Sequence, residues 1–318
     1  MLLSGRLTHI AMLFGVVIGT TVAALAADPG TPIPATSAIS DQKAGSVLFY
    51  NKYISNASNP ATENTRINIT NTSPTARAFV HFFFVDGASC APADNLLCLT
   101  PNQTASFLAS DIDPGVQGYI IAIAVDGTSG LPAPFNFLVG DAYFKEASQH
   151  AANLGAVAAA LVGAGPTTNA DGYTATLNFD DAQYNALPRV LAADSIPSQV
   201  NHVTNLIVYS PASDLINGGT GAGRVFGILY DDTESAFSFG FSLKCHLEAP
   251  LLALLRTTPR INVLIPQGRT GWLKLWEVGG APLLGAVVTK GESFGGHNLH
   301  ALTFTTATIT MPVFPPSC

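Results

Sequence analysis

The stretch that decides the fold is Phe79-Val80-His81-Phe82-Phe83-Phe84-Val85. Alternate side chains of a β-strand point to opposite faces, so this run is apolar on both faces apart from His81. A strand of this kind has to be covered on two sides. The run therefore predicts a central strand that is sandwiched between other layers.

Short runs of β-branched and aromatic residues continue on both sides of this strand, separated by Asn, Gly, Pro and Asp turns. Polar and apolar residues alternate in Arg66–Thr70, and three rings share one face of Phe237–Phe241, which predicts a strand with its rings on a core. Several short strands at such spacing are typical of a β-sandwich. The expected strands are residues 46–53, 65–70, 76–85, 104–108, 119–125, 135–139, 173–179, 205–209, 224–230, 236–243, 261–265, 271–278, 284–288 and 299–310.

One segment has a longer period. Residues 142–165 are rich in alanine and predict the main helix, and the Gly, Thr, Pro and Asn of residues 163–172 indicate a domain boundary. We therefore expect a mostly β protein with two β-sandwich-like domains, residues 46–165 and 166–318, and the Ala-rich helix between them.

The N-terminus has the pattern of an export signal. Arg6 precedes an uncharged apolar run, and Ala24-Leu25-Ala26 fits a cleavage site, so residues 1–26 are the expected signal peptide. The apolar run is shorter than the roughly 20 residues that a spanning helix needs, which disfavours the alternative of an uncleaved anchor. Residues 27–45 would then be a flexible leader. We expect a secreted or cell-surface protein, or a periplasmic one, with no membrane span after signal cleavage.

Composition excludes two classes of protein. Of 318 residues, 47% are hydrophobic and 11% charged, against roughly 25% charged in an ordinary soluble domain. Fourteen basic and twenty-one acidic residues give a net charge of −7, and no stripe of Lys or Arg is available to neutralise phosphates. Nucleic-acid binding is therefore not expected. Intrinsic disorder is excluded as well, because the apolar content is sufficient for a core.

The chain has four cysteines, Cys90, Cys98, Cys245 and Cys318, and disulfides are the default in an exported protein. Three pairings are possible. The short loop favours Cys90 with Cys98, which leaves Cys245 with Cys318. A zinc site is the rival interpretation, but no Cys-x-x-Cys pair exists.

Two acidic clusters are candidates for calcium, which prefers several hard oxygen ligands from one loop. One cluster is Asp111 and Asp113, and the other is Asp231, Asp232 and Glu234. Neither fits the spacing of an EF-hand, and aspartate is also common at turns and helix starts for capping reasons alone.

Trp272 and Trp276 share one face of an expected strand, with Lys274 between them. If the rings are exposed, they form a platform for sugars or another apolar partner. If they are buried, they belong to the core. Leu273 and Leu275 on the other face leave no obviously wet side, which favours the core interpretation.

Two further motifs carry little weight. Gly291-Glu292-Ser293-Phe294-Gly295 matches the nucleophile elbow of serine hydrolases, but no helix is expected after Ser293 and no acid follows it. His297 and His300 would share a face of a helix, whereas on a strand they point to opposite sides. Paired metal ligation would require His297 to lie in irregular chain.

Seven stretches are long and specific as strings: GSVLFYN (45–51), NTRINITN (64–71), VHFFFVDGASC (80–90), CLTPNQTASF (98–107), FGILYDDTESAFSF (226–239), GRTGWLKLW (268–276) and GHNLHALT (296–303). Through them the chain, over most of residues 45–318, resembles a group of uncharacterised secreted bacterial β-rich proteins with no assigned activity. The resemblance implies export and a β-rich fold and adds no site.

No constellation of acid, base and nucleophile emerges from the sequence. We therefore expect an exported, non-catalytic surface or extracellular binding or structural module, whose partner is a protein or carbohydrate at the cell surface. Calcium is the only cofactor that the residues suggest. The alternative is an extracellular hydrolase, with or without a metal at one of the acidic clusters.

Overall fold

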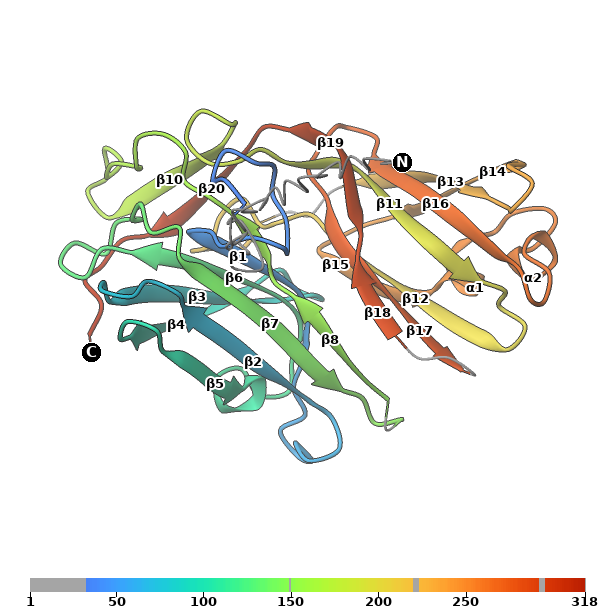
Figure 1. The fold of residues 1–318 in the computed structure, drawn as a ribbon, viewed down its shortest axis with the longest axis horizontal. Helices are drawn as coiled ribbons and strands as arrows, with labels where there is room; N and C mark the ends of the chain where they lie inside the picture. The colour runs from blue at the N-terminus through green and yellow to red at the C-terminus, as the bar shows by residue number, and fades with distance from the viewer. Residues whose placement is uncertain (1–32, 149, 220–222, 292–294, 318) are drawn as a thin grey trace, which may run out of the picture. The chain divides into compact units, whose positions relative to one another are not determined.

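The computed structural model describes residues 33–148, 150–219, 223–291 and 295–317 (Figure 1). Residues Ile33–Cys318 form one compact unit. Strands account for 53% and helices for 4%, which confirms the mostly β class. The export signal predicted at residues 1–26 lies outside the described residues. No helix in the described ranges is long and apolar enough to cross a membrane.

The described residues form five antiparallel sheets, named A to E here. Sheet A has the order β4 (Pro92–Leu99), β3 (Ala78–Asp86), β6 (Gln117–Val125), β1 (Val47–Ile54) and β9 (Val157–Ala159), and sheet B the order β5 (Thr104–Leu108), β2 (Asn64–Asn71), β7 (Leu138–Lys145) and β8 (Ala151–Gly155). Sheet C pairs β10 (Thr174–Phe179) with β20 (Ala307–Pro312).

Sheet D has the order β14 (Ala236–Ser242), β13 (Arg224–Tyr230), β16 (Thr270–Glu277), β11 (Leu187–Pro197) and β19 (His300–Thr305), and sheet E the order β15 (His246–Pro250), β12 (His202–Tyr209), β17 (Leu284–Gly291) and β18 (Gly295–Asn298). Three short helices complete the elements: the 3-10 helix η1 (Ala109–Asp111), α1 (Leu251–Leu254) and α2 (Ile261–Leu264).

Strand β3 is central and covered on both faces, as the Phe79–Val85 run predicts. Phe82 and Phe84 belong to the core between sheets A and B, whereas Phe83 and Val85 belong to the core on the other face of sheet A. The one polar residue, His81, is buried, and its Nε2 lies 2.8 Å from Oδ2 of Asp94 on β4. The burial lowers the pKa of His81.

The hydrophobic clusters of the described residues connect more sheets than a sandwich requires. One lies between sheets A and B, one between D and E, one between B and E, and one joins sheets A and C to residues of β11, β12 and β17. The sheets are thereby arranged as a four-blade, propeller-like ring, and not as a pair of separate sandwiches. Sheets A and B use only residues 47–159 and the others only residues 174–312, yet two of the clusters combine both parts.

The Ala-rich helix predicted at residues 142–165 is wrong, because this segment forms β8, β9 and part of β7. Ala156 and Ala158–Ala160 are buried, and Ala158 and Ala159 are fully inaccessible. Space is short there, since a Cβ on Gly45 would lie 2.5 Å from the carbonyl oxygen of Ala159. Packing therefore outweighs the helix propensity of alanine. The strand expected at residues 261–265 is also wrong, because α2 occupies it.

The last part of the expected flexible leader is packed against the fold. Ile39 is buried in the core, and Ser40 forms a β-bridge with Ala158. The Nζ of Lys43 is buried and donates to Oδ1 of Asn185 at 2.7 Å. The chain is thus anchored to the sheets from Ile39 onward.

The disulfide is Cys90–Cys245, with a Cα–Cα distance of 5.5 Å and a sequence separation of 155. Both predicted pairings, Cys90–Cys98 and Cys245–Cys318, are therefore wrong. The reason is that residues 92–99 form β4, and a strand extends by about 3.3 Å per residue, which keeps Cys98 far from Cys90. Cys98 is disulfide-bonded too. Cys318 lies outside the described residues and is, by elimination, its expected partner.

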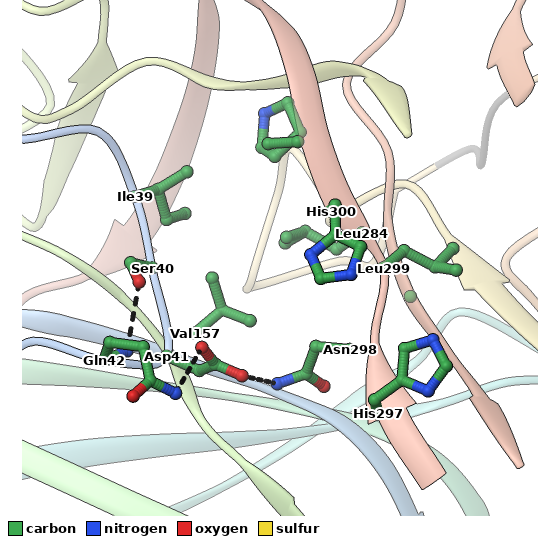
Figure 2. Close-up of a pocket in the computed structure, with 13 residues that line it drawn as sticks. Ile39, Ser40, Asp41, Gln42, Val157, Leu284, His297, Asn298, Leu299 and His300 are labelled. Carbon is green, nitrogen blue, oxygen red and sulfur yellow. Dashed lines mark hydrogen bonds between the residues drawn. The ribbon is translucent and has the colours of Figure 1, made fainter. Parts of the chain in front are cut away.

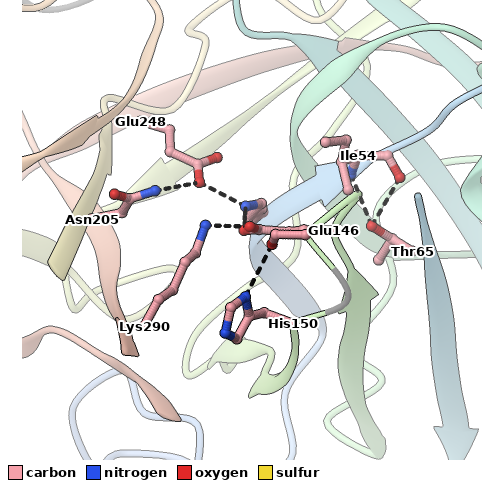
Figure 3. Close-up of polar contacts among 9 residues, drawn as sticks. Ile54, Thr65, Glu146, His150, Asn205, Glu248 and Lys290 are labelled. Atoms are coloured by element: carbon pink, nitrogen blue, oxygen red, sulfur yellow. Dashed lines mark hydrogen bonds and ion pairs between the residues drawn. The ribbon is translucent and has the colours of Figure 1, made fainter. Parts of the chain in front are cut away.

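A buried ion cluster, defined by Lys52, Glu146, Glu248 and Lys290, connects sheet A to sheet E (Figure 3). The Nζ of Lys52 on β1 lies 2.9 Å from Oε1 of Glu146 and 2.7 Å from Oε1 of Glu248 on β15. Lys290 on β17 pairs with the other oxygen of Glu146. Burial alone would raise the pKa of Glu146, but Lys290 and Lys52 outweigh it and hold this pKa below its usual value. Glu146 is thus ionised at neutral pH.

Next to this cluster, His246 is expected to make the fold sensitive to acid. Burial lowers the pKa of His246 to about 4, and its Nε2 has no hydrogen-bond partner among the described residues. The unfolded chain takes up a proton near pH 6.5, whereas the folded chain does not. The stability that neutral His246 contributes is therefore present above pH 6.5 and is lost as the pH falls towards 4, by roughly 2–3 kcal/mol.

Urea unfolding at several pH values checks this expectation. His246→Asn cannot titrate, so the variant should lose less stability than the parent between pH 6.5 and 4. Other acids, including Glu146, titrate in both proteins, and the difference between the two curves isolates His246. Parallel curves for parent and variant would contradict the expectation.

Candidate metal centre and the adjoining aromatic face

The outer face of sheet D carries the two tryptophans of the chain. On β16, Leu273 and Leu275 are buried in the core between sheets D and E, so Trp272, Lys274 and Trp276 point to the opposite face. Trp272 is 37% exposed and Trp276 is half-buried. Neither tryptophan belongs to the buried core, which is the interpretation that the sequence favours. Their position on the outer face agrees with the platform interpretation.

The aromatic side chains of this face are paired across neighbouring strands. Tyr230 on β13 stacks on Trp272, with ring centroids 4.1 Å apart and planes at 9°. Phe226, also on β13, lies 5.1 Å from Trp276, and the Nζ of Lys274 lies 5.8 Å from the centre of the Trp276 ring. The two ring pairs are thus held by the β13–β16 register.

Small side chains border these rings on β14. The phenylalanines of β14 face the core between sheets D and E, as predicted, and the exposed residues between them are Ser238 and Gly240. Ser238 pairs with Ile228 on β13, which pairs in turn with Lys274. The aromatic rings therefore lie next to two small residues, one of which, Ser238, carries a hydroxyl group.

On the other side of β16, the aromatic face ends at a group of three side chains. Strand β11 has a bulge between Ala193 and Ile196, and Ser195 there has a φ of 53°. Asp194 in this bulge is exposed and lies on the outer face, because its neighbour Ala193 is buried in the core. A bulge re-aims side chains in this way. His300 begins β19 and pairs with Ala192, two residues before Asp194.

The group is completed by His297 from β18 of sheet E. The buried Leu299 separates β18, which pairs with β17 of sheet E, from β19, which pairs with β11 of sheet D. His297 and His300 therefore do not lie on one continuous strand. Their rings lie 6.0 Å apart with planes at 26°. The expectation that strand geometry separates the two histidines is therefore wrong. His297 lies in strand β18 and not in irregular chain, and the change of strand at Leu299 brings the two histidines together.

The three side chains converge on one point. The Oδ1 of Asp194 lies 3.3 Å from Nε2 of His297 and 3.6 Å from Nε2 of His300. Each of the three residues offers one ligand atom, and these three ligand atoms lie within 4.8 Å of one another. Burial, together with the charge of His300, lowers the pKa of His297, and Asp194 opposes this shift. In the described ranges this is the only group of three or more His, Cys, Asp or Glu that could hold a metal ion.

Both histidines also line a cavity of about 410 Å³ (Figure 2). Its other walls include Ile39, Asp41 and Leu284. Asn298, which lies between the histidines, donates to Oδ2 of Asp41 at 2.7 Å and to the carbonyl oxygen of Gly155 at 2.8 Å. These bonds fix β18 against the N-terminal segment and β8.

The acidic clusters have structural partners. Oδ1 of Asp231 accepts hydrogen bonds from the backbone of Thr233 and Ser235 in the β13–β14 turn, and Asp232 pairs with Arg269 at 2.7 Å. Oδ2 of Asp113 accepts from the hydroxyl of Tyr53 at 2.5 Å. Asp111 caps the backbone of Leu108, and Glu234 has a positive φ of 64° in the turn. These contacts favour turn and capping roles, and calcium binding there stays a prediction.

The hydrolase motif falls partly outside the described residues, since Glu292, Ser293 and Phe294 are among those not described. The two flanking glycines belong to β17 and β18, which pair with each other. A strand follows the motif, whereas a nucleophile elbow needs a helix.

Sequence reasoning does not single out Asp194. It lies in β11, for which the sequence predicts no strand, because two prolines and the Asp194-Ser195 pair interrupt its apolar pattern. A polar pair inside an apolar run is a weak signal of a bulge, and nothing in the sequence connects it to His297. No protein-family model matches the chain, and no curated protein matches it either, so the roles of these residues follow from their geometry alone.

Proposed function

We propose that the protein is an exported, non-catalytic binding module that holds a neutral glycan chain on the outer face of sheet D. The observation that carries this proposal is the exposure of Trp272, stacked on Tyr230, on the sheet face turned away from the core. Export is supported by the signal pattern of residues 1–26, by the resemblance to secreted proteins and by the disulfide, which suits an oxidising compartment.

The mixture of groups on this face matches a sugar better than an apolar partner. A pyranose presents C–H groups on its faces and hydroxyls on its edges. Aromatic rings pack against the C–H groups, and Ser238 and Lys274 offer hydrogen bonds to the hydroxyls. Two cations, Lys274 and Arg224, and one anion, Asp194, lie on this face, whereas the chain as a whole carries −7. The net charge of the chain disfavours a polyanion, and this favours a neutral glycan.

Tryptophan fluorescence tests the proposal directly, because both tryptophans of the chain lie on this face. Titration with a panel of soluble neutral polysaccharides should shift the emission of the full-length protein with one of them. Trp272→Ala should weaken binding of that polysaccharide by roughly thirtyfold, as expected for an aromatic anchor worth about 2 kcal/mol. Affinity electrophoresis measures this loss independently of fluorescence.

Tyr173→Ala is the matched control, because Tyr173 is 64% exposed and lies on sheet C's flank, away from β16. This variant should bind as the parent does. If no neutral polysaccharide binds, or if Trp272→Ala and Tyr173→Ala bind equally, the proposal is wrong. If the parent self-associates and Trp272→Ala does not, the occupant of the face is a second copy of the chain.

The alternative is an extracellular hydrolase, and one observation favours it: Asp194, His297 and His300 converge beside the cavity of Figure 2. A hydrolase needs an activated water and a group that moves its proton. Purified protein screened with ester, peptide and glycoside substrates, with and without added zinc, should show no turnover. Turnover that His300→Gln abolishes would replace the binding module by the hydrolase.

A further inference from the structure

Asp194, His297 and His300 form a ligand set that neither the sheet D surface nor a hydrolase motif accounts for. We propose that these three side chains bind one divalent transition-metal ion, with zinc as the best-fitting member of that class. Two imidazole nitrogens and one carboxylate oxygen are ligands that Zn²⁺ accepts readily. The proposal concerns this group alone and does not depend on what the aromatic face binds.

The distances fit an ion of this size. Zinc bonds to nitrogen and oxygen are about 2.0–2.1 Å, and neighbouring ligands of a tetrahedral ion are therefore roughly 3.3 Å apart. Oδ1 of Asp194 lies 3.3 Å and 3.6 Å from the two Nε2 atoms. Calcium is a poor fit, because it prefers six to eight oxygen ligands.

A second observation points to a missing partner. Nε2 of His297 is shielded from solvent and makes no hydrogen bond among the described residues, although Oδ1 of Asp194 lies 3.3 Å away. A shielded polar atom without a partner is unfavourable unless something binds it. Because this atom is also one of the three that converge, an ion between them would satisfy it.

The fold holds the three ligands on two sheets. Asp194 is aimed by the bulge at Ser195, whose φ of 53° is an uncommon conformation for a residue other than glycine. His300 is fixed by the pairing of β19 with β11, and His297 by the bonds of Asn298 to Asp41 and Gly155. A bound ion would therefore clip β18 of sheet E to the edge of sheet D.

The site is open to solvent. The side chains of Asp194 and His300 are 65% and 60% exposed. Three protein ligands leave the fourth tetrahedral position free for water or for a donor atom from a ligand. Because Asp194 and His300 are exposed, replacing either of them removes no core contact, so these two variants should fold.

Isothermal titration with ZnCl₂ tests the site in the full-length protein after dialysis against EDTA. We expect one zinc ion per chain. Asp194→Asn, His297→Gln and His300→Gln should each weaken binding by at least about tenfold. His202→Gln is the matched control, because His202 is a half-buried histidine outside the group, and it should bind zinc as the parent does.

Two further readouts separate binding from misfolding. Zinc should raise the melting temperature of the parent and of His202→Gln, and should leave that of the three ligand variants unchanged. Co²⁺, which replaces zinc, should give the intense visible absorption of a four-coordinate site in the parent and not in the variants. The proposal is overturned if the parent shows no saturable zinc binding, or if the three ligand variants bind zinc as tightly as the parent.

Discussion

Lys52→Met is expected to lower the free energy of unfolding by about 3–5 kcal/mol. The side chain of Lys52 is only 2% exposed, and its ammonium group neutralises Glu146 and Glu248. Methionine fills a similar volume without the charge, so both carboxylates would remain buried with less compensation. Glu248 would be left with the amide of Asn205 at 3.3 Å, a much weaker partner for a charge than an ammonium group. Urea unfolding at pH 7 measures the loss.

Two variants serve as controls for this result. Lys244→Met changes an exposed lysine and should shift stability by less than about 0.5 kcal/mol. Adding Glu248→Gln to Lys52→Met removes one of the uncompensated charges and should restore part of the loss. A loss below about 1 kcal/mol for Lys52→Met would show that the buried ion cluster contributes little to stability.

Loss of the Cys90–Cys245 disulfide is expected to cost about 2–5 kcal/mol. The bond closes a loop with a sequence separation of 155, and the restriction of the unfolded chain grows with loop length. It also joins the turn after β3 to the start of β15, two elements that belong to different sheets. Chemical unfolding of Cys245→Ser measures the cost.

Because both cysteines belong to one bond, Cys90→Ser and Cys245→Ser should cost the same, and the double variant little more than either. A non-reducing peptide map should recover Cys90 linked to Cys245, and Cys98 linked to Cys318. Recovery of a Cys90–Cys98 peptide would contradict the structure and restore the pairing that the short loop suggests.

The strand pattern predicts those parts of the fold in which a face is either clearly apolar or clearly polar. Residues 104–108 and 224–230 form strands with the expected limits, and the rings of Phe237–Phe241 face the core. The pattern does not reveal that alanines near Ala158 are small because sheet A lies close to its neighbours. That constraint comes from residues far away in the sequence, and helix propensity alone points to the wrong element.

The candidate site likewise has some features that the sequence predicts and others that it does not. The period of two predicts that Trp272 and Trp276 share a face, and this is confirmed, but both faces of β16 are apolar, so the sequence cannot tell which one is outside. His297 and His300 come together only because the chain changes sheets at Leu299. Asp194 joins them through a bulge in a strand that carries two prolines. Both the change of sheet at Leu299 and the bulge at Asp194 interrupt regular strand geometry, and the periodicity of the sequence does not predict such interruptions.

Sheet C has a consequence for how the chain is made. Ile309 and Met311 of β20 belong to the same hydrophobic cluster as Val47 and Phe49 of β1, and the two pairs of residues lie about 260 positions apart in the sequence. At a synthesis rate of about 5–20 residues per second, the early strands wait roughly 10–50 s for the residues of β20. The cluster that joins β1 to β20 is therefore completed only after nearly all of the described strands have been synthesised, and until then this side of β1 lacks the cover of β20.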